Sequence, residues 1–106
     1  MAGSDTRRVR RAAPAATGYS LLLVEDNPHH AEVIRRRLER SADGPIRISH
    51  ACTLAEALKR LGEGGVEAVL LDLVLPDSSI DETLPSVLEA FPGVPVIVLT
   101  SLDDME

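Results

Sequence analysis

Short aliphatic runs recur along this chain, and turn-forming residues bound each of them. The runs lie at Leu21–Val24, Ala68–Asp72 and Val94–Leu99, and a weaker alternation covers Arg47–Ala51. An aliphatic run without a helical period is typical of a strand buried on both faces of a parallel sheet. The weaker alternation predicts a shorter strand near a sheet edge. Between the runs, apolar residues recur at helical spacing. The β-α-β-α-β-α-β order predicts a parallel sheet with helices on both faces, joined by right-handed crossovers.

The first two intervening segments have clear helix starts. Asn27 suits an N-cap and Pro28 suits the first helical position, which predicts a helix from there to about Arg40. Thr53, followed three residues later by Glu56, forms a capping box at the start of the second helix.

Pro85 determines where the third helix is expected to begin. Proline is accepted in the first turn of a helix but not in its interior. We therefore expect this helix to begin late, with Asp81 or Thr83 as its cap. The residues from Ser101 onward predict the first turn of a fourth helix.

Charge is unevenly distributed along the chain. Residues 1–18 carry four arginines and one aspartate, a balance of +3, and the whole chain is −6, so residues 19–106 hold −9. An acidic body argues against nucleic-acid binding, which depends on neutralising phosphates. We expect a disordered basic arm over residues 1–18 and one acidic domain over residues 19–106.

Cys52 is the single cysteine, so no disulfide framework or cysteine-based zinc site is expected. We expect its side chain to be a small buried hydrophobe. The basic arm lacks the apolar centre of a secretory signal, and no apolar run approaches the length of a membrane span. These features indicate a cytoplasmic protein without membrane contact.

Acidic and hydroxyl side chains stand at the carboxyl ends of the predicted strands. Glu25 and Asp26 follow the first strand, Asp72 ends the third, and Thr100 follows the fourth. The carboxyl ends of parallel strands meet at one edge, where open sheets bind ligands. Crowded carboxylates repel one another, and carboxylate oxygens are ligands that Mg²⁺ prefers. A carboxylate nucleophile, a hard cation and a hydroxyl donor together indicate acyl-phosphate chemistry on an aspartate.

Three stretches of the chain, LLLVEDNP, VLLDLVLPDSS and VPVIVLTS, carry a family resemblance in their residues, order and spacing. They resemble the receiver domain of two-component response regulators, over Tyr19–Glu106. The resemblance implies a flavodoxin-like, doubly wound parallel sheet of strand order 2-1-3-4-5. It also implies a signalling module of a phosphorelay rather than an enzyme, with no catalytic residue of its own.

The resemblance assigns a role to each residue of the acidic edge. Asp72 would accept a phosphoryl group from a histidine kinase or a histidine phosphotransfer protein. Mg²⁺ would be held by Asp26, by Glu25 through water, by Asp72 and by the backbone carbonyl of Val74. Thr100 would bind a phosphoryl oxygen and act in the switch.

The chain departs from the family pattern in two places. Ile80 stands where such receivers have a glycine, and an isoleucine with positive φ would cost about 1–2 kcal/mol, so the loop is expected to have another shape. The sequence ends where the family continues with a further helix, a fifth strand and a last helix. The fifth strand normally carries a lysine, and the only lysine here is Lys59, on the second predicted helix. We therefore expect a fragment or truncated product lacking the last strand and helices, with slow phosphorylation.

Without a fifth strand, the fourth predicted strand becomes an exposed apolar edge. Such an edge invites pairing with another chain, which gives a homodimer or a partner chain as the expected occupant. Two alternatives to a phosphoacceptor remain open at this point. One is a degenerate receiver that acts only as a protein–protein interaction module. The other is a hydrolase that uses Asp72 on small phosphoesters, although Val74 stands where such enzymes have a second acid.

A histidine pair and an arginine cluster near the first predicted helix are expected to be exposed to solvent. His29 and His30 are adjacent and point about 100° apart on a helix, so we expect solvated side chains near the mouth of the site rather than metal ligands. The arginines of Arg35–Arg40 are expected to form a solvated face.

Overall fold

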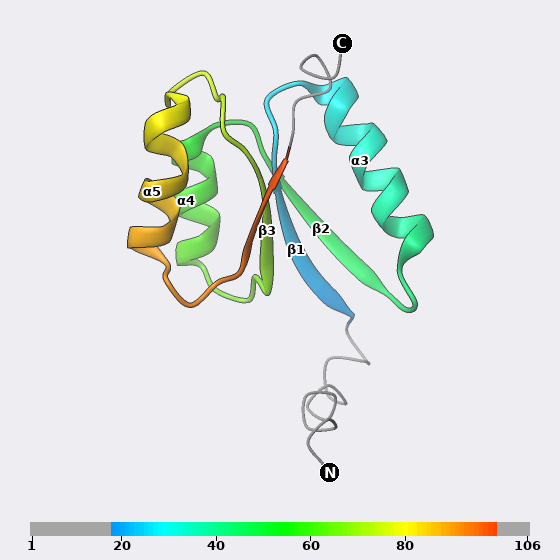
Figure 1. The fold of residues 1–106 in the computed structure, drawn as a ribbon. Helices are drawn as coiled ribbons and strands as arrows, with labels where there is room; N and C mark the ends of the chain where they lie inside the picture. The colour runs from blue at the N-terminus through cyan, green and yellow to red at the C-terminus, as the bar shows by residue number, and fades with distance from the viewer. Residues whose placement is uncertain (1–17, 100–106) are drawn as a thin grey trace.

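A computed structural model describes residues 18–99 of the chain, which fold into one sheet between two layers of helices (Figure 1). The strands are β1 (Tyr19–Val24), β2 (Ile46–Ala51), β3 (Ala68–Asp72) and β4 (Val96–Leu99), and the helices are α3 (Pro28–Ser41), α4 (Leu54–Gly62) and α5 (Ile80–Ala90). The predictions for the basic arm, Thr100 and the fourth helix lie outside the described residues.

The sheet is parallel throughout, with strand order β2-β1-β3-β4. This is the predicted doubly wound order as far as the described strands extend, with β2 at one edge as expected. In the register of β1 and β3, Val24 pairs with Leu71. The residues that follow, Glu25 and Asp72, therefore lie side by side at the carboxyl edge.

Strand alternation divides the core between the two faces of the sheet. Helices α4 and α5 cover one face and α3 covers the other (Figure 1). The larger cluster lies under α4 and α5, and its strand residues include Leu22, Val24, Val69 and Leu71. The smaller cluster lies under α3 and consists of Leu23, Ala31 and Leu70. Burying each large aliphatic side chain contributes about 1.5–3 kcal/mol, so the two central strands are the main source of stability.

The first two helices begin as the sequence predicts. The side chain of Asn27 accepts hydrogen bonds from the backbone of His29 and His30, and Pro28 is the first residue of α3. The hydroxyl of Thr53 accepts from the backbone of Glu56 at 3.0 Å. The Glu56 carboxylate accepts in turn from the backbone of Cys52, one residue before the cap.

The prediction of a late start for the third helix is wrong. Helix α5 begins at Ile80 with Ser79 as its N-cap, so Pro85 lies inside the helix rather than in its first turn. The helix begins early because the buried hydroxyl of Thr83 contacts the carbonyls of Leu73 and Ser79, each at 2.8 Å. These contacts hold the first turn against the preceding loop. An interior proline costs about 3 kcal/mol, which this packing offsets.

Ile80 meets no backbone strain in this arrangement. As the first residue of α5 it has helical geometry, and no non-glycine residue among residues 18–99 has a positive φ. The loop therefore does take a shape that needs no glycine at this position, as the sequence predicts.

Strand β4 begins two residues later than predicted, at Val96. Pro95 has no backbone N–H, but its carbonyl accepts from Val69 at 2.9 Å. Within residues 18–99, β4 pairs with β3 alone, and Ile97 and Val98 are 54% and 43% exposed. The described part of the chain thus has the exposed apolar edge that the sequence predicts.

The prediction that Cys52 is buried is wrong. Its thiol is free and exposed, because the residue follows β2 in the connection to α4, beyond the covered part of the sheet. Among the described helices, none combines the length and apolar character needed to cross a membrane.

Candidate functional site

Three carboxylates meet at the carboxyl edge of the two central strands. One oxygen each from Glu25, Asp26 and Asp72 can be chosen so that all lie within 4.8 Å of one another. Glu25 and Asp72 are buried, at 5% and 8% exposure, whereas Asp26 is exposed. The register of β1 and β3 explains the meeting, because both buried acids come one residue after the Val24–Leu71 pair. Alternation along the strands then places their side chains on the same face.

Glu25 is held in place by its backbone and by its carboxylate. Its N–H donates to the carbonyl of Ala51 at 3.0 Å, and one carboxylate oxygen accepts from the backbone of Asn27 at 3.1 Å. The ring nitrogen Nε2 of His50 lies 2.7 Å from the carbonyl oxygen of Glu25. The two backbone contacts hold Glu25 beside the end of β2, and the amide of Asn27 holds its carboxylate.

The pKa of Glu25 is raised above its ordinary value of 4.5. Burial is the largest cause, and the neighbouring charge of Asp72 and a side-chain hydrogen bond to it act in the same direction. The amide of Asn27 and the charge of His30 act in the opposite direction but do not cancel the effect. The cluster therefore holds more negative charge than its surroundings stabilise.

A hard divalent cation fits this donor set. The three carboxylates offer only oxygen ligands, and their mutual repulsion would be relieved by positive charge between them. Two of the acidic residues are buried and one is exposed, so a bound ion could keep some of its waters. These properties match Mg²⁺ better than a metal that prefers sulfur or imidazole.

The loop after Asp72 is tied to the phosphoacceptor candidate itself. The backbone N–H of Val74 donates to an Asp72 carboxylate oxygen at 3.0 Å, while the Val74 side chain is 58% exposed. The predicted site residues Glu25, Asp26, Asp72 and Val74 thus share one edge of the sheet. Thr100 lies outside the described residues, but Leu99, the residue before it, pairs with Asp72.

His30 is closer to the acidic cluster than its expected solvated position suggests. Its Nδ1 lies 3.9 Å from a carboxylate oxygen of Glu25, and its side chain is only 17% exposed. His29 is exposed, as expected. The first turn of α3 turns one histidine toward the site and the other toward solvent.

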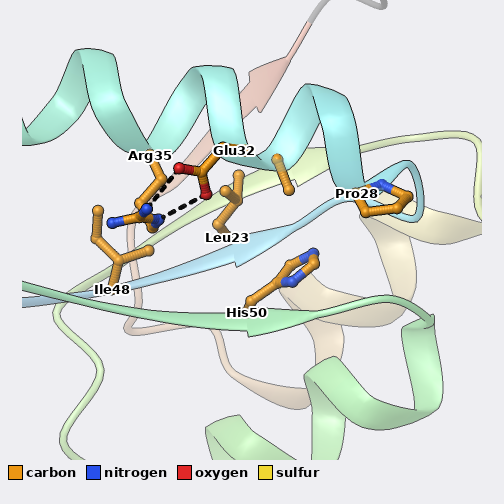
Figure 2. Close-up of a pocket in the computed structure, with 7 residues that line it drawn as sticks. Leu23, Pro28, Glu32, Arg35, Ile48 and His50 are labelled. Carbon is orange, nitrogen blue, oxygen red and sulfur yellow. Dashed lines mark hydrogen bonds and ion pairs between the residues drawn. The ribbon is translucent and has the colours of Figure 1, made fainter.

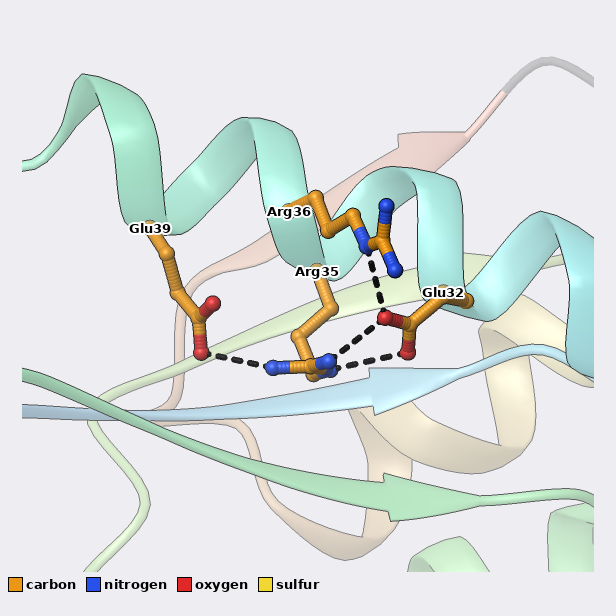
Figure 3. A network of polar contacts seen from close by, with 4 residues as sticks. All are labelled: Glu32, Arg35, Arg36 and Glu39. Atoms are coloured by element: carbon orange, nitrogen blue, oxygen red, sulfur yellow. Dashed lines mark hydrogen bonds and ion pairs between the residues drawn. The ribbon is translucent and has the colours of Figure 1, made fainter.

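Two of the arginines of α3, Arg35 and Arg36, form a surface network with Glu32 and Glu39 (Figure 3). Arg35 bridges Glu32 and Glu39 at 2.6 and 2.8 Å, and Arg36 shares Glu32 at 2.8 Å. These contacts lower the pKa of Glu32 and raise that of Arg35. Arg36, Arg37 and Arg40 are exposed, as predicted for a solvated face.

A pocket of about 310 Å³ lies beside this network, between α3 and the edge strand β2 (Figure 2). Its lining residues are Leu23, Pro28, Ala31, Glu32, Arg35, Ile48 and His50. None of the three clustered acids is among them, so the pocket is separate from the acidic site.

His50 and Asp77 also lie near the site, although the sequence motifs do not single them out. His50 sits near the end of β2 and pairs in register with Leu23, so the predicted order of the strands could have placed it beside Glu25. The carboxylate of Asp77 accepts from the backbone of Leu54 and Ala55, which are distant in sequence. No local sequence pattern predicts a contact between residues so far apart in the chain.

Fold and site together define a doubly wound α/β domain with an acidic cluster where parallel sheets bind ligands. The family model of the response regulator receiver domain matches residues 21–106. The chain therefore belongs to the receiver domain family of two-component response regulators, as the sequence motifs indicate.

Individual relatives agree with this assignment. The chain is 32% identical over 87 residues to the swarming motility regulation protein RssB of Serratia marcescens, a match that covers 82% of this chain and 38% of that protein. It thus spans little more than a third of that relative.

Two solved structures show the same fold. One is the MaeR response regulator bound to beryllium trifluoride, at 30% identity and a TM-score of 0.69, covering 78% of this chain and 67% of that chain. The other is the histidine kinase ThkA in complex with the response regulator protein TrrA, at 26% identity and a TM-score of 0.68, covering 78% and 69%.

Proposed function

We propose that this receiver domain accepts a phosphoryl group on Asp72 from a histidine kinase or a histidine phosphotransfer protein. The observation that carries the proposal is the cluster of Glu25, Asp26 and Asp72 within 4.8 Å at the edge of a receiver fold. Asp72 is the last residue of the central strand β3, which pairs with β1, the strand that leads into Glu25 and Asp26.

The proposed step exchanges one phosphorus bond for another. A carboxylate oxygen of Asp72 forms a bond to phosphorus while the bond from phosphorus to the donor imidazole nitrogen breaks. The leaving imidazole takes up a proton from water, and the product is an acyl phosphate. Such transfers depend on positioning and charge neutralisation more than on covalent chemistry by the protein.

Mg²⁺ is the proposed cofactor, held by Asp26, Asp72 and the carbonyl of Val74, and by Glu25 through water. It would neutralise the charge of the carboxylates and of the incoming phosphoryl group. The raised pKa of Glu25 is in line with this, because burial, and to a lesser extent the nearby charge of Asp72, disfavour its ionised form, and a cation would favour it. Thr100 is the proposed hydrogen-bond donor to a phosphoryl oxygen.

The proposed partners follow from the same assignment. The likeness to a response regulator seen in complex with a histidine kinase supports a kinase as the donor. A second copy or a partner chain at β4 is proposed from the exposure of Ile97 and Val98. The interaction-module alternative is less favoured because the acidic cluster is present, and a signalling module fits the family better than a hydrolase.

The test is phosphorylation by acetyl phosphate with Mg²⁺, followed by intact-mass measurement. The wild type should gain one phosphoryl group, and Asp72→Asn should gain none. Asp26→Asn should need at least about tenfold more Mg²⁺ to reach the same phosphorylation, because it loses a metal ligand. Asp43→Asn, an exposed acid in the turn after α3, is the matched control and should behave as wild type. A wild type that gains no mass, or a gain retained by Asp72→Asn, would remove the proposal.

A further inference from the structure

Asp77 connects the loop after Asp72 to the start of helix α4. Its two carboxylate oxygens accept separately from the backbone N–H groups of Leu54, at 2.8 Å, and Ala55, at 3.0 Å. Leu54 and Ala55 are the first two residues of α4. The contact spans 22 and 23 residues of sequence, so it joins two elements that the chain itself does not connect directly.

The carboxylate completes the hydrogen bonding of the first turn of α4. The next N–H, that of Glu56, donates to the hydroxyl of Thr53, and the N–H of Ala57 donates to the carbonyl of Thr53. The first helical N–H groups have no partner within a helix and attract negative charge. The two hydrogen bonds lower the pKa of Asp77, so its side chain contacts α4 in the ionised form.

At its other end the same loop is tied to the phosphoacceptor. The N–H of Val74 donates to Asp72, and the hydroxyl of Thr83 contacts the carbonyl of Leu73. Leu75 and Ser78 form a two-residue bridge, at 3.3 and 3.2 Å, which closes the loop just around Asp77. Leu75 is buried at 5% exposure. The backbone beside Asp72 and the carboxylate of Asp77 are thus parts of one short, internally bonded loop.

We propose that Asp77 is a positioning residue that couples the first turn of α4 to the state of the Asp72 site. The inference rests on the proposed function of Asp72 and adds a route by which the site reaches α4. With Asp77 docked, the loop holds the Val74 backbone beside the carboxylates. With Asp77 released, the loop keeps its short bridge, the contacts of Val74 and Thr83 and the buried Leu75, but it loses its direct link to α4.

Coupling of this kind acts in both directions. If docking of Asp77 favours the loop arrangement that binds Mg²⁺ and a phosphoryl group, then ligands at Asp72 must strengthen the docking of Asp77. The amides of Leu54 and Ala55 then become reporters of the site, although no ligand touches them. The amide of Glu56, which bonds to Thr53 instead, is an internal comparison in the same helical turn.

The experiment compares Asp77→Ala with Thr53→Ala. Each variant removes a side-chain cap from the first turn of α4, but only Asp77 belongs to the loop after Asp72. Binding of Mg²⁺ with beryllium fluoride is measured by calorimetry, and amide hydrogen exchange is measured with and without these ligands. Asp77→Asn keeps an acceptor oxygen and serves as the conservative variant. Far-UV circular dichroism confirms that each variant is folded.

For the wild type, we expect the ligands to slow exchange at Leu54 and Ala55 more than at Glu56. Asp77→Ala should weaken ligand binding by about fivefold or more, the lower range of typical couplings. Asp77→Asn should recover part of that loss, and Thr53→Ala should bind as the wild type does. Equal binding by Asp77→Ala and the wild type, or equal losses in Asp77→Ala and Thr53→Ala, would overturn the coupling and leave the proposed function intact. A wild type that binds neither ligand would remove both.

Discussion

Replacing Glu25 by Gln should stabilise the metal-free protein and remove most of its stabilisation by Mg²⁺. Glu25 is buried at 5% exposure and shares a site with two other carboxylates. Glutamine has nearly the same shape, and its amide oxygen can still accept from the backbone of Asn27. The substitution therefore removes a charge while leaving the packing and this hydrogen bond in place.

The size of the effect follows from the separation of the acids. Two unit charges at 4.8 Å, the upper limit of the separations in the cluster, repel by about 0.9 kcal/mol at the dielectric constant of water and by about 3.5 kcal/mol at an effective value of 20. Asp26 is exposed and Asp72 is buried, so the true value lies between these limits. We expect about 1–3 kcal/mol of added stability. For a domain of this size, each kcal/mol raises Tm by about 4–8 °C.

The raised pKa of Glu25 also predicts how the stability of the protein changes with pH. The pKa of Glu25 is raised in the folded protein, so the native state binds more protons than the unfolded chain from about pH 4.5 upward to the folded pKa. Stability contributed by this group is therefore full below that window and is lost as pH rises through it. Glu25→Gln should lack this loss, and the two stability curves should diverge as pH rises.

The assay is thermal unfolding followed by circular dichroism, in EDTA and in excess Mg²⁺, at several pH values. The wild type should gain stability from Mg²⁺, since the ion binds the folded state, and Glu25→Gln should gain much less. Asp43→Asn removes an exposed charge of the same sign far along the chain and is the control. A Glu25→Gln protein that is no more stable than wild type in EDTA at neutral pH would refute the repulsion argument.

Three further substitutions test other parts of the structure. Gly18→Ala should lower the free energy of unfolding by at least about 1–2 kcal/mol, because Gly18 has a φ of +80° and its added Cβ would lie 2.5 Å from the Pro45 carbonyl oxygen. Gly44→Ala, with open space around the added Cβ, should lose far less stability. Equal losses of the two variants in chemical denaturation would contradict the reasoning. Thr83→Val should cost about 1–3 kcal/mol, because it leaves the carbonyl of Leu73 without its hydroxyl partner, and an unchanged denaturation midpoint would count against that bond. Ile97→Lys, at a residue 54% exposed on the β4 edge, should leave stability within about 0.5 kcal/mol and abolish self-association in sedimentation; a wild type that stays monomeric at high concentration would argue against a second copy at this edge.

The strands and their parallel arrangement could be predicted from the residues because burial acts on local composition, whereas the strand order was implied by the family resemblance. Buried strands such as β3 need continuous aliphatic residues, and the intervening helices need apolar stripes and caps such as Asn27 and Thr53. The convergence of Glu25, Asp26 and Asp72 then follows from parallel topology alone.

Predictions failed where the deciding contact came from another element. Pro85 signals a helix start locally, yet the helix begins five residues earlier because Thr83 is anchored on the loop after β3. Cys52 is apolar enough to be buried, but its position beyond the end of β2 leaves it exposed. In both cases the position of the residue in the fold outweighed its own preference.

By itself, the sequence determined the parallel α/β architecture, the acidic edge and the family to which the chain belongs. These depend on hydrophobic periodicity and on the ends of strands, which neighbouring residues encode. Only the tertiary structure decided that Glu25 is buried with a raised pKa, that His50 reaches its carbonyl and that Asp77 docks on α4. The physical reason is that desolvation and contacts between distant backbone segments exist only after the chain has packed, so no local pattern can carry them.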